Sequence, residues 1–345
     1  MSGRRGRKGK GGGASATRRR ALAALASLLA AYALFAAAAV WFVHQPGEWR
    51  SERDASWPGF LTAALYWVGN GLGDITDGLG LTGRDAVYEY DEDPPVGKVL
   101  FAGAPKRVGN VQPDDITVLD RGEFVVGWSP SLRRPVWCAY HVTPNPLYET
   151  GKRPSFTKDR AAANSPAPSD YGRGGYDRGH MVPNHAIESR YGKDEQRKTF
   201  LMSNIAPQTP ALNRGVWRNV EHRIADFWPA RYGEIWVVVG TIPGAGHETV
   251  SGTDIEVPGK FFQLVVAQEG MEVRALAVLL DQNVSWREWA ARSIVSIDEL
   301  EEASGLDFLP NLPSFIQDPL EADHPTRLWP VRLADVFRLF LLRFS

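Results

Sequence analysis

The stretch from Ala21 to Val43 runs for 23 residues without a charged side chain, and no other feature limits the architecture of the chain as strongly. As an α-helix, a segment of this length extends about 35 Å, enough to cross a ~30 Å hydrocarbon layer with some tilt. Three arginines, residues 18–20, stand directly before it, and such a basic flank stays on the cytoplasmic side of a membrane. The sequence therefore predicts one N-terminal transmembrane helix over residues 21–43.

Two other interpretations of this segment stay open. A cleaved signal peptide has a shorter apolar region, of roughly 7–15 residues, but the alanines at 36–39 offer small-residue cleavage sites. An Arg-rich leader without acidic residues is also typical of mitochondrial targeting, although its glycines make a poor amphipathic helix. We expect a membrane-anchored protein whose main domain is exported to the periplasmic or extracellular side. Secretion, or the mitochondrial intermembrane space, is the alternative.

The charges are unevenly distributed, although the formal net charge of the 345 residues is only −1. Residues 1–20 contain eight Lys or Arg and no acid, and this Gly-rich stretch cannot bury a core, so we expect disorder there. Residues 151–230 contain 13 Lys or Arg against 8 Asp or Glu, whereas the rest of the chain beyond residue 20 is acidic. A basic segment within an acidic body indicates a local site for a polyanion, with a solvated surface as the alternative.

The main domain is expected to mix strands and helices. Segments rich in β-branched and aromatic residues predict strands at Glu123–Trp128, Pro135–Val142, Glu234–Thr241, Phe261–Ala267 and Val273–Leu280. Two Ser-x-x-Glu pairs, beginning at Ser285 and Ser296, predict helix starts, and Gly305 would end the second helix. Short strands interrupted by helices favour an α+β fold over a doubly wound sheet.

Composition divides the chain into five parts. They are a basic disordered N-terminus over residues 1–20, the apolar segment over 21–43, a linker over 44–80, one folded domain over 81–325 and an amphipathic helix over 326–345. The last part interleaves apolar and arginine side chains, a pattern that suits either packing on the domain or a membrane surface. Packing on the domain is the favoured interpretation.

Residues 174–184, Gly-Gly-Tyr-Asp-Arg-Gly-His-Met-Val-Pro-Asn, gather polar groups between turn-forming residues. Among them, His180 can take a proton from water near neutral pH. Arg178 can hold a phosphate through two parallel N–H donors, which lysine does less well. A lone histidine is more often structural, so this segment needs support from elsewhere in the chain.

The support comes from residues 199–221. A helical stripe of apolar residues predicts a helix over residues 214–228, with Asn213 at its start. Glu221 follows two turns later, about 80° around the helix axis, so it and Asn213 could flank one cleft. The simpler roles are a helix N-cap for Asn213 and a solvent-facing side chain for Glu221.

Together the two segments resemble the DNA/RNA non-specific endonuclease family. The matching pattern is Asp-Arg-Gly-His at residues 177–180, followed by Asn204, Gln208, Asn213 and Glu221 at spacings of 4, 5 and 8. The resemblance covers roughly residues 80–325. It implies the ββα-metal (His-Me finger) nuclease fold of endonuclease G-like proteins, with a central antiparallel sheet.

Ten residues are expected to form the site, most of them with roles implied by the resemblance and Arg214 and Arg218 because they lie near the expected cleft. Expected catalytic residues are His180, Arg178, Glu221 and Asn204; expected substrate-binding residues are Arg153, Asp177, Gln208, Arg214 and Arg218; the expected metal ligand is Asn213. His180 is similar to the general base, and Asn213 to the direct protein ligand of Mg²⁺, with Mn²⁺ as the alternative. Glu221 is similar to the carboxylate that holds metal-bound water. This oxygen-donor set suits Mg²⁺, which keeps several waters.

The expected function is therefore metal-dependent hydrolysis of phosphodiester bonds in DNA and RNA. Little sequence preference is expected, because phosphate contacts carry no sequence information. The expected partners are the nucleic-acid backbone, the membrane through residues 21–43, and a second copy of the chain. A phosphodiesterase for another substrate and a nucleic-acid-binding or uptake protein without cleavage are the alternatives. A pure binder needs arginines but neither a base nor a metal ligand, so His180 and Asn213 favour cleavage.

Three nearby residues are expected to be structural. His185 follows His180 by five positions but forms no zinc motif, since the sequence has no His-Glu-x-x-His and only one cysteine. That cysteine, Cys138, excludes an intramolecular disulfide and a Cys-rich metal site, and it lies on a predicted buried strand with His141.

Overall fold

The computed structural model describes residues 30–31, 34–35, 38, 88–89, 98–148, 151–172, 174–269 and 272–331. The predicted N-terminal segments 1–20, 21–43 and 44–80 and the C-terminal helix over 326–345 lie largely or wholly outside these residues. Within the described residues, no helix has the length and apolar character needed to cross a membrane. The chain separates into two compact units, Met1–Gly73 and Asp74–Ser345, and the second contains nearly all of the described residues.

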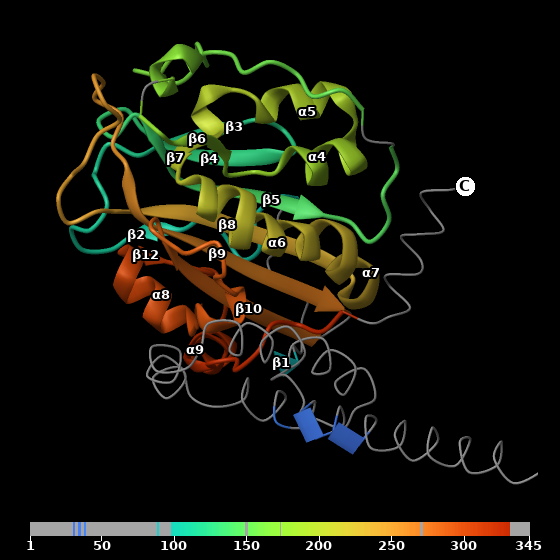
Figure 1. The fold of residues 1–345 in the computed structure, drawn as a ribbon. Helices are drawn as coiled ribbons and strands as arrows, with labels where there is room; N and C mark the ends of the chain where they lie inside the picture. Colours follow the sequence, from blue (N-terminus) through green and yellow to red (C-terminus); the bar gives the residue numbers. More distant parts are fainter. Residues whose placement is uncertain are drawn as a thin grey trace, which may run out of the picture. The chain divides into compact units, whose positions relative to one another are not determined.

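The second unit is built on an eight-stranded antiparallel sheet (Figure 1). Its strand order is β1-β10-β9-β8-β5-β4-β3, with β11 also paired to β10. The bounds are β1 Tyr88–Glu89, β3 Thr117–Asp120, β4 Phe124–Ser129, β5 Arg134–Val142, β8 Glu234–Pro243, β9 Pro258–Glu269, β10 Glu272–Asp281 and β11 Ile294–Val295. The five strands predicted from composition are β4, β5, β8, β9 and β10. The predicted mixture of helices and strands around a central antiparallel sheet is thus confirmed.

A hydrophobic core covers each face of the sheet. Alternate side chains along each strand point to opposite faces, so each central strand contributes to both cores. On β5, Cys138 and Tyr140 belong to one hydrophobic core, and Trp137 and Ala139 to the other. The first core also contains α4 (Asn184–Tyr191), α6 (Trp217–His222) and α7 (Trp228–Tyr232); the second contains α8 (Ile297–Ser304) and α9 (Ser314–Ala322) (Figure 1). The central strands are therefore apolar on both faces, which holds the site elements against a rigid layer.

A small two-stranded sheet lies on the first face. Strand β6 (Asp177–His180) pairs antiparallel with β7 (Ile205–Gln208), and α4, α5 (Lys193–Thr199) and η2 (Met202–Asn204) connect them. A side chain at Gly179 would collide with Gln208 on β7, so only glycine allows this close pairing. The pairing and the helix that follows β7 bring the two motif segments side by side.

The helical segment after β7 is kinked. It contains two π-helical segments, η3 (Leu212–Val216) and η4 (Arg223–Phe227), on either side of α6, and the backbone leaves helical geometry at Gly215 (φ −101°, ψ −115°). The predicted helix over 214–228 is confirmed. It is not the regular α-helix that was assumed when Glu221 was placed about 80° around the axis from Asn213. Asn213 is not an N-cap, because its backbone N–H donates to Thr209 O (2.9 Å) within the first turn.

Of the two predicted helix starts, one is confirmed. At α8, Ser296 Oγ accepts from Glu299 N (3.1 Å), Glu299 Oε2 accepts from Ser296 N (2.8 Å), and Gly305 ends the helix in left-handed geometry (φ 65°). The helix predicted at Ser285 is wrong: the segment makes a turn and then a short 3₁₀ helix, η5 (Ala290–Arg292). The chain has only a few residues there before β11 must pair with β10.

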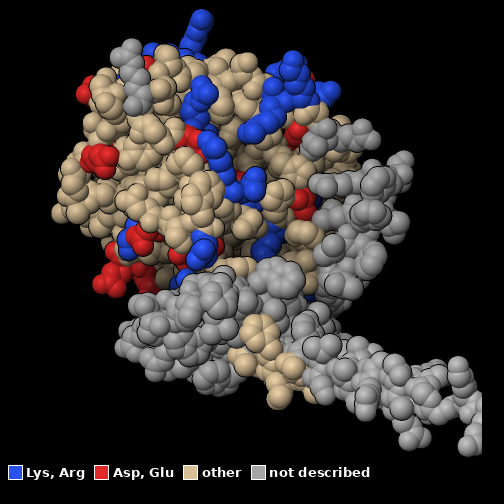
Figure 2. All heavy atoms as spheres, in the orientation of Figure 1, with Lys and Arg blue, Asp and Glu red and all other residues tan. Residues whose placement is uncertain are grey.

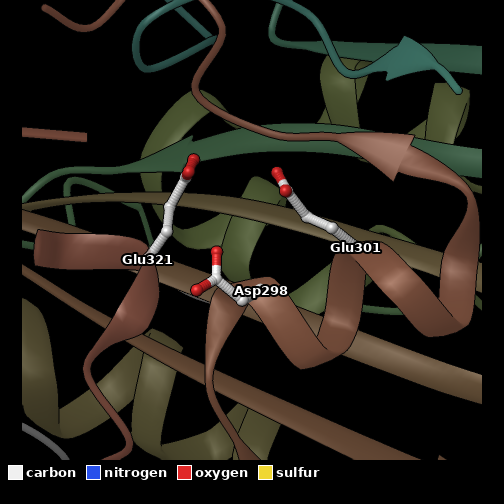
Figure 3. A group of neighbouring side chains, drawn as sticks. All are labelled: Asp298, Glu301 and Glu321. Atoms are coloured by element: carbon white, nitrogen blue, oxygen red, sulfur yellow. The ribbon is translucent and has the colours of Figure 1, made fainter. Parts of the chain in front are cut away.

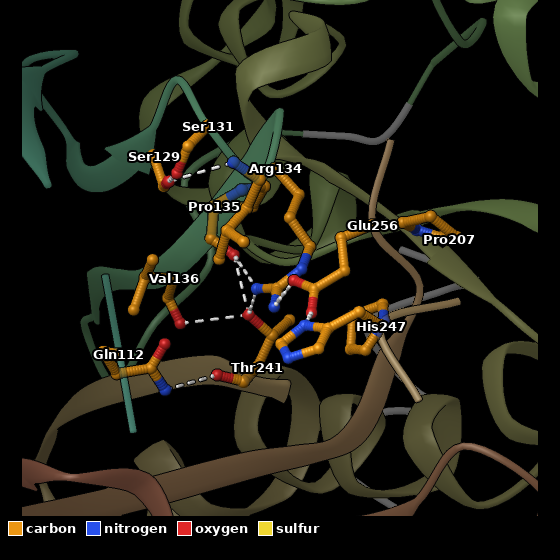
Figure 4. A network of polar contacts seen from close by, with 12 residues as sticks. Gln112, Ser129, Ser131, Arg134, Pro135, Val136, Pro207, Thr241, His247 and Glu256 are labelled. Carbon is orange, nitrogen blue, oxygen red and sulfur yellow. Dashed lines mark hydrogen bonds and ion pairs between the residues drawn. The ribbon is translucent and has the colours of Figure 1, made fainter. Parts of the chain in front are cut away.

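A buried ion pair fixes the loop that supports β7 (Figure 4). Arg134, at the start of β5, is completely buried; its Nη2 donates to Glu256 Oε2 (2.5 Å) and its Nη1 to Thr241 Oγ1 on β8. Glu256 Oε1 also pairs with His247 Nδ1 (3.2 Å). The loop around Glu256 contributes apolar side chains to a small core that includes Ile205 of β7. The network therefore links the central sheet to the back of the small one.

Three carboxylates gather on the opposite face of the sheet (Figure 3). Oxygens of Asp298 and Glu301 on α8 and of Glu321 on α9 lie within 4.8 Å of one another. Burial, together with the neighbouring carboxylates, raises the pKa of Glu301 to about 7 and that of Glu321 to about 8. Both accept hydrogen bonds, Glu301 from Phe308 N and Glu321 from Gln317 Nε2. This group is separate from the polar residues of the two motif segments.

Candidate active site

A cavity of about 660 Å³ opens between β6, the start of α4 and the helix after β7. Eight of the ten predicted site residues line it: Arg153, Asp177, Arg178, His180, Asn213, Arg214, Arg218 and Glu221. On the face seen in Figure 2, Lys and Arg side chains gather in a band over the region of β6, β7 and α6. The fold thus brings together residues up to 68 positions apart, from Arg153 to Glu221, and surrounds them with positive charge.

His180 ends β6 and is packed between aromatic rings. Its ring centroid lies 5.3 Å from that of Phe156 and 4.7 Å from that of Phe200. Burial, with a further contribution from the Arg153 cation, lowers the pKa of His180 to about 3. The imidazole is therefore neutral at neutral pH and can accept a proton. Its Nε2 is buried without a hydrogen-bond partner among the described residues, so Nδ1 is the nitrogen available to the cavity.

The same two aromatic rings hold arginines at the cavity. The Arg178 guanidinium lies 4.6 Å from the Phe156 ring centroid, and that of Arg153 lies 5.6 Å from the Phe200 ring centroid. Such cation–π contacts restrict the long side chains while leaving N–H groups free for an anion. Two guanidinium groups are thus arranged around the neutral imidazole.

Asp177, at the start of β6, fixes the orientation of two neighbours. It accepts two hydrogen bonds from Arg214 (2.7 and 2.5 Å) and one from Asn213 Nδ2 (2.9 Å). The hydrogen bonds from Arg214 and then Asn213 hold the pKa of Asp177 below its usual value. An ionised carboxylate only accepts, so Asn213 must direct its NH₂ group to it and keeps its carbonyl oxygen Oδ1 for another ligand. The role of Asp177 in this structure is therefore to orient the side chains of Asn213 and Arg214.

Glu221 lies on α6, two turns after Asn213. Its Oε1 accepts from Trp217 Nε1 (3.0 Å), and its other oxygen has no partner among the described residues. Burial raises the pKa of Glu221 to about 8, against the opposing effects of Trp217 and the Arg153 and Arg218 cations. A cation placed in the cavity would favour the ionised form.

The donors available for a metal are hard oxygen atoms. Asn213, whose Oδ1 has no partner in the described part of the chain, and the Glu221 carboxylate line one cavity, and Mg²⁺ or Mn²⁺ accepts such oxygen ligands together with water. The cysteine Cys138 lies in the sheet, fully buried, and burial raises its pKa well above the ordinary value, so it supplies no thiolate. The residues present therefore fit a hard divalent cation.

Two predicted site residues do not line the cavity. Asn204 is fully buried; its Oδ1 accepts from Val182 N (2.9 Å), and its Nδ2 donates to Val182 O and Thr199 O. It holds the chain just after His180 in place. Gln208, expected to bind substrate, is also completely buried, packed against Gly179 behind β6. Gln208 therefore does not line this cavity, and its side chain fills the space left by the missing side chain of Gly179.

Comparisons with known proteins identify the family of the chain. The sequence model of the DNA/RNA non-specific endonuclease family matches residues 103–315. The chain belongs to this family. A nuclease of Nostoc sp. is 28% identical over 247 residues, covering 66% of this chain and 86% of the relative; mitochondrial endonuclease G of Bos taurus is 27% identical over 209 residues, covering 56% and 69%. The expected family resemblance is thus confirmed.

A solved structure shares the fold of this family member. The crystal structure of an EndoG/EndoGI complex aligns with a TM-score of 0.53 at 21% sequence identity, over 60% of this chain and 91% of that one. The likeness covers the mixed α/β unit with its central antiparallel sheet.

Sequence reasoning missed one group at the cavity of this endonuclease. His185 of α4 and His222 of α6 both line it, and both bind Asp226 of η4 behind them: His185 Nε2 donates to Oδ1 (2.7 Å) and His222 Nδ1 to Oδ2 (3.0 Å). The four-residue spacing of His222 and Asp226 on one predicted helix could have indicated that these two side chains are in contact. The contribution of His185, 41 positions before Asp226, had no local signal and was interpreted as structural.

Proposed function

We propose that the protein is a metal-dependent endonuclease that hydrolyses phosphodiester bonds in DNA and RNA with little sequence preference. Its membership of a nuclease family supports hydrolysis of nucleic acid. The observation that carries the proposal is one cavity lined by the neutral imidazole of His180, by Asn213, whose Oδ1 has no partner among the described residues, and by guanidinium groups.

In this mechanism His180 is the general base. Because Nε2 is buried, Nδ1 takes the proton from the attacking water, and the neutral state needed for this persists throughout the physiological pH range. A proton acceptor in position contributes on the order of 10²–10⁴-fold in rate. The Phe156 and Phe200 rings keep the imidazole in place.

The remaining residues would stabilise the negative charge on the phosphate. Arg178 and Arg153 would donate N–H groups to the nonbridging phosphate oxygens, where charge develops during attack. Asn213 Oδ1 would hold Mg²⁺, with Mn²⁺ as the alternative, and Glu221 would orient water bound to it. When bound, the cation neutralises charge on the phosphate and on the leaving oxygen.

The expected lack of sequence preference follows from the cavity lining. Its polar groups are guanidinium, imidazole, carboxylate and amide groups directed at a phosphate-sized site, and contacts with phosphate carry no sequence information. Acceptance of both DNA and RNA is part of the proposal and comes from the family description.

The test uses the full-length chain in mild detergent with plasmid DNA and with structured RNA. We expect digestion of both with Mg²⁺ and none with a chelator, and digestion by His180→Ala with Mg²⁺ that is about 10²–10⁴-fold slower. Tight binding of nucleic acid without digestion by the wild type would contradict the proposal and support the alternative of a binding or uptake protein.

We further propose that residues 21–43 anchor the protein in a membrane with the nuclease domain on the exported side. The proposal rests on the uncharged segment and the arginines before it. After cell fractionation, the full-length protein should stay with membranes in a high-salt wash. Release as a shortened soluble form would instead support cleavage of the segment.

A further inference from the structure

The cavity extends beyond the catalytic residues to the group formed by His185, His222 and Asp226. The side chains of His185 and His222 are 38% and 50% exposed, whereas Asp226 is 15% exposed and lies behind them. The three residues come from three helical segments, α4, α6 and η4. Both rings line the cavity that contains His180. The proposed chemistry does not use this group.

Asp226 sets the direction of both rings. Although burial alone would raise its pKa, the hydrogen bonds from His185 and His222 hold the pKa of Asp226 well below its usual range, so it is an ionised acceptor. Each ring must therefore direct an N–H group to it. This leaves His185 Nδ1 without a partner among the described residues, on a ring whose orientation is fixed at the cavity surface.

A purely structural link between α4 and η4 would not need a ring that stays exposed in the cavity. A nucleic-acid strand, in contrast, carries a phosphate on each side of the one being cleaved. We propose that His185, oriented by Asp226, binds a second phosphate of the substrate strand next to the scissile one. This inference rests on the proposed function, because the strand must enter the cavity for His185 to reach it.

The contact is a charge-assisted hydrogen bond. In its protonated form His185 donates Nδ1–H to a phosphate oxygen while Nε2–H stays on Asp226. Charged groups surround the ring. They are the Asp226 carboxylate behind it and the cations of Arg218 on α6, Arg223 on η4 and Arg190, whose Nη2 donates to Ala225 O (2.5 Å); Glu221, with its pKa raised to about 8, is mainly neutral at pH 6 when no cation is bound.

The first experiment measures binding without cleavage. A fluorescein-labelled single-stranded oligonucleotide is titrated with full-length protein in chelator, at pH 6 and pH 8 and over a range of salt concentrations. We expect His185→Gln to weaken binding about fivefold at pH 6 and less at pH 8. At pH 6 the slope of log Kd against log salt should fall by about 0.7, the value for one lost phosphate contact on a single strand.

The matched control is His324→Gln. His324 is also half exposed and also paired with a carboxylate, Glu299 (3.0 Å), but it lies outside the cavity. Its substitution should change neither the affinity nor the salt slope. An affinity loss in His185→Gln with an unchanged salt slope would overturn the proposal, because it would indicate a structural link alone. Asp226→Asn, which keeps the size but loses the charge, should weaken binding in the same pH-dependent way.

The second experiment separates this inference from the proposed function. Bis(p-nitrophenyl) phosphate has a single phosphodiester and no neighbouring phosphate, so it cannot reach His185 while bound for cleavage. We expect the rise in KM caused by His185→Gln to be about fivefold larger for the oligonucleotide than for this compound. Equal losses on both substrates would overturn the inference. A wild type that cleaves neither substrate would contradict the proposed function, and the binding experiment would still decide the role of His185.

Discussion

We predict that the free energy of unfolding falls as the pH rises, because of the carboxylates on α8 and α9. Glu321 is only 6% exposed, and burial, with Glu301 and Asp298 nearby, raises its pKa from 4.5 to about 8. The folded protein therefore keeps a proton on Glu321 at neutral pH, whereas the unfolded chain releases it. Because the folded-state pKa is the higher one, this contribution to stability is complete below about pH 4.5 and is lost as the pH rises to about 8.

The magnitude follows from the displacement of the pKa. At 1.36 kcal/mol per unit, the change from 4.5 to about 8 corresponds to at most ~5 kcal/mol. Solvent reaches part of the three-carboxylate group, and Glu301 titrates together with Glu321. We therefore expect the free energy of unfolding to fall by about 2 kcal/mol between pH 5 and pH 8. Glu321→Gln removes the titrating group and keeps an acceptor for Gln317 Nε2. The variant should match the wild type at pH 5 and be about 2 kcal/mol more stable at pH 8.

The assay is urea unfolding of the full-length protein at both pH values. Glu302→Gln is the matched control, because Glu302 is an exposed glutamate on α8, the helix that carries Asp298 and Glu301. Its substitution should leave the pH dependence of the unfolding free energy as it is in the wild type. An effect of Glu321→Gln that is equal at pH 5 and pH 8 would refute the reasoning.

Three further predictions concern the site and its support. His180→Ala should slow plasmid digestion about 10²–10⁴-fold, measured on gels with Mg²⁺, while duplex affinity in chelator stays within a few-fold of the wild type. Asn213→Ala should raise the Mg²⁺ concentration for half-maximal activity about 10–100-fold in a metal titration; an unchanged midpoint would remove Asn213 as the ligand. Arg134→Met should leave the buried Glu256 carboxylate with only the exposed His247 as a partner and lower the free energy of unfolding by about 3–5 kcal/mol in urea; a loss below 1 kcal/mol would show that the pair is not needed.

Much of the fold could be predicted because its signals are local. The central strands are runs of β-branched and aromatic residues, and they read as strands whichever neighbours they pair with. The capping box of Ser296 specifies a helix start through two hydrogen bonds between residues three apart. The same pattern at Ser285 failed because the segment packs Ala290 and Ala291 into the first core and then pairs β11 with β10, tertiary contacts that no local pattern carries.

Part of the site could also be predicted, because motif spacing is a signal that the sequence itself carries. Motif spacing and the family resemblance identified the residues that line the cavity, including His180 and Asn213. Whether a side chain enters the cavity or lies behind it depends on which face of β7 it occupies, so the burial of Gln208 was not predictable from spacing. The contact of His185 with Asp226 joins two helices that are far apart in the sequence, and only the folded chain brings them together.

The kink at Gly215 makes the direction of Asn213 depend on a single backbone position. The helix beyond the kink packs on the first core through Trp217, Val220 and Ile224, whereas Asn213 lies before the kink and donates to Asp177. A substitution that straightens the backbone at Gly215 would turn the Asn213 amide away from Asp177 while the packed part of the helix stays in place. Folding and cutting thus depend on opposite sides of one bend.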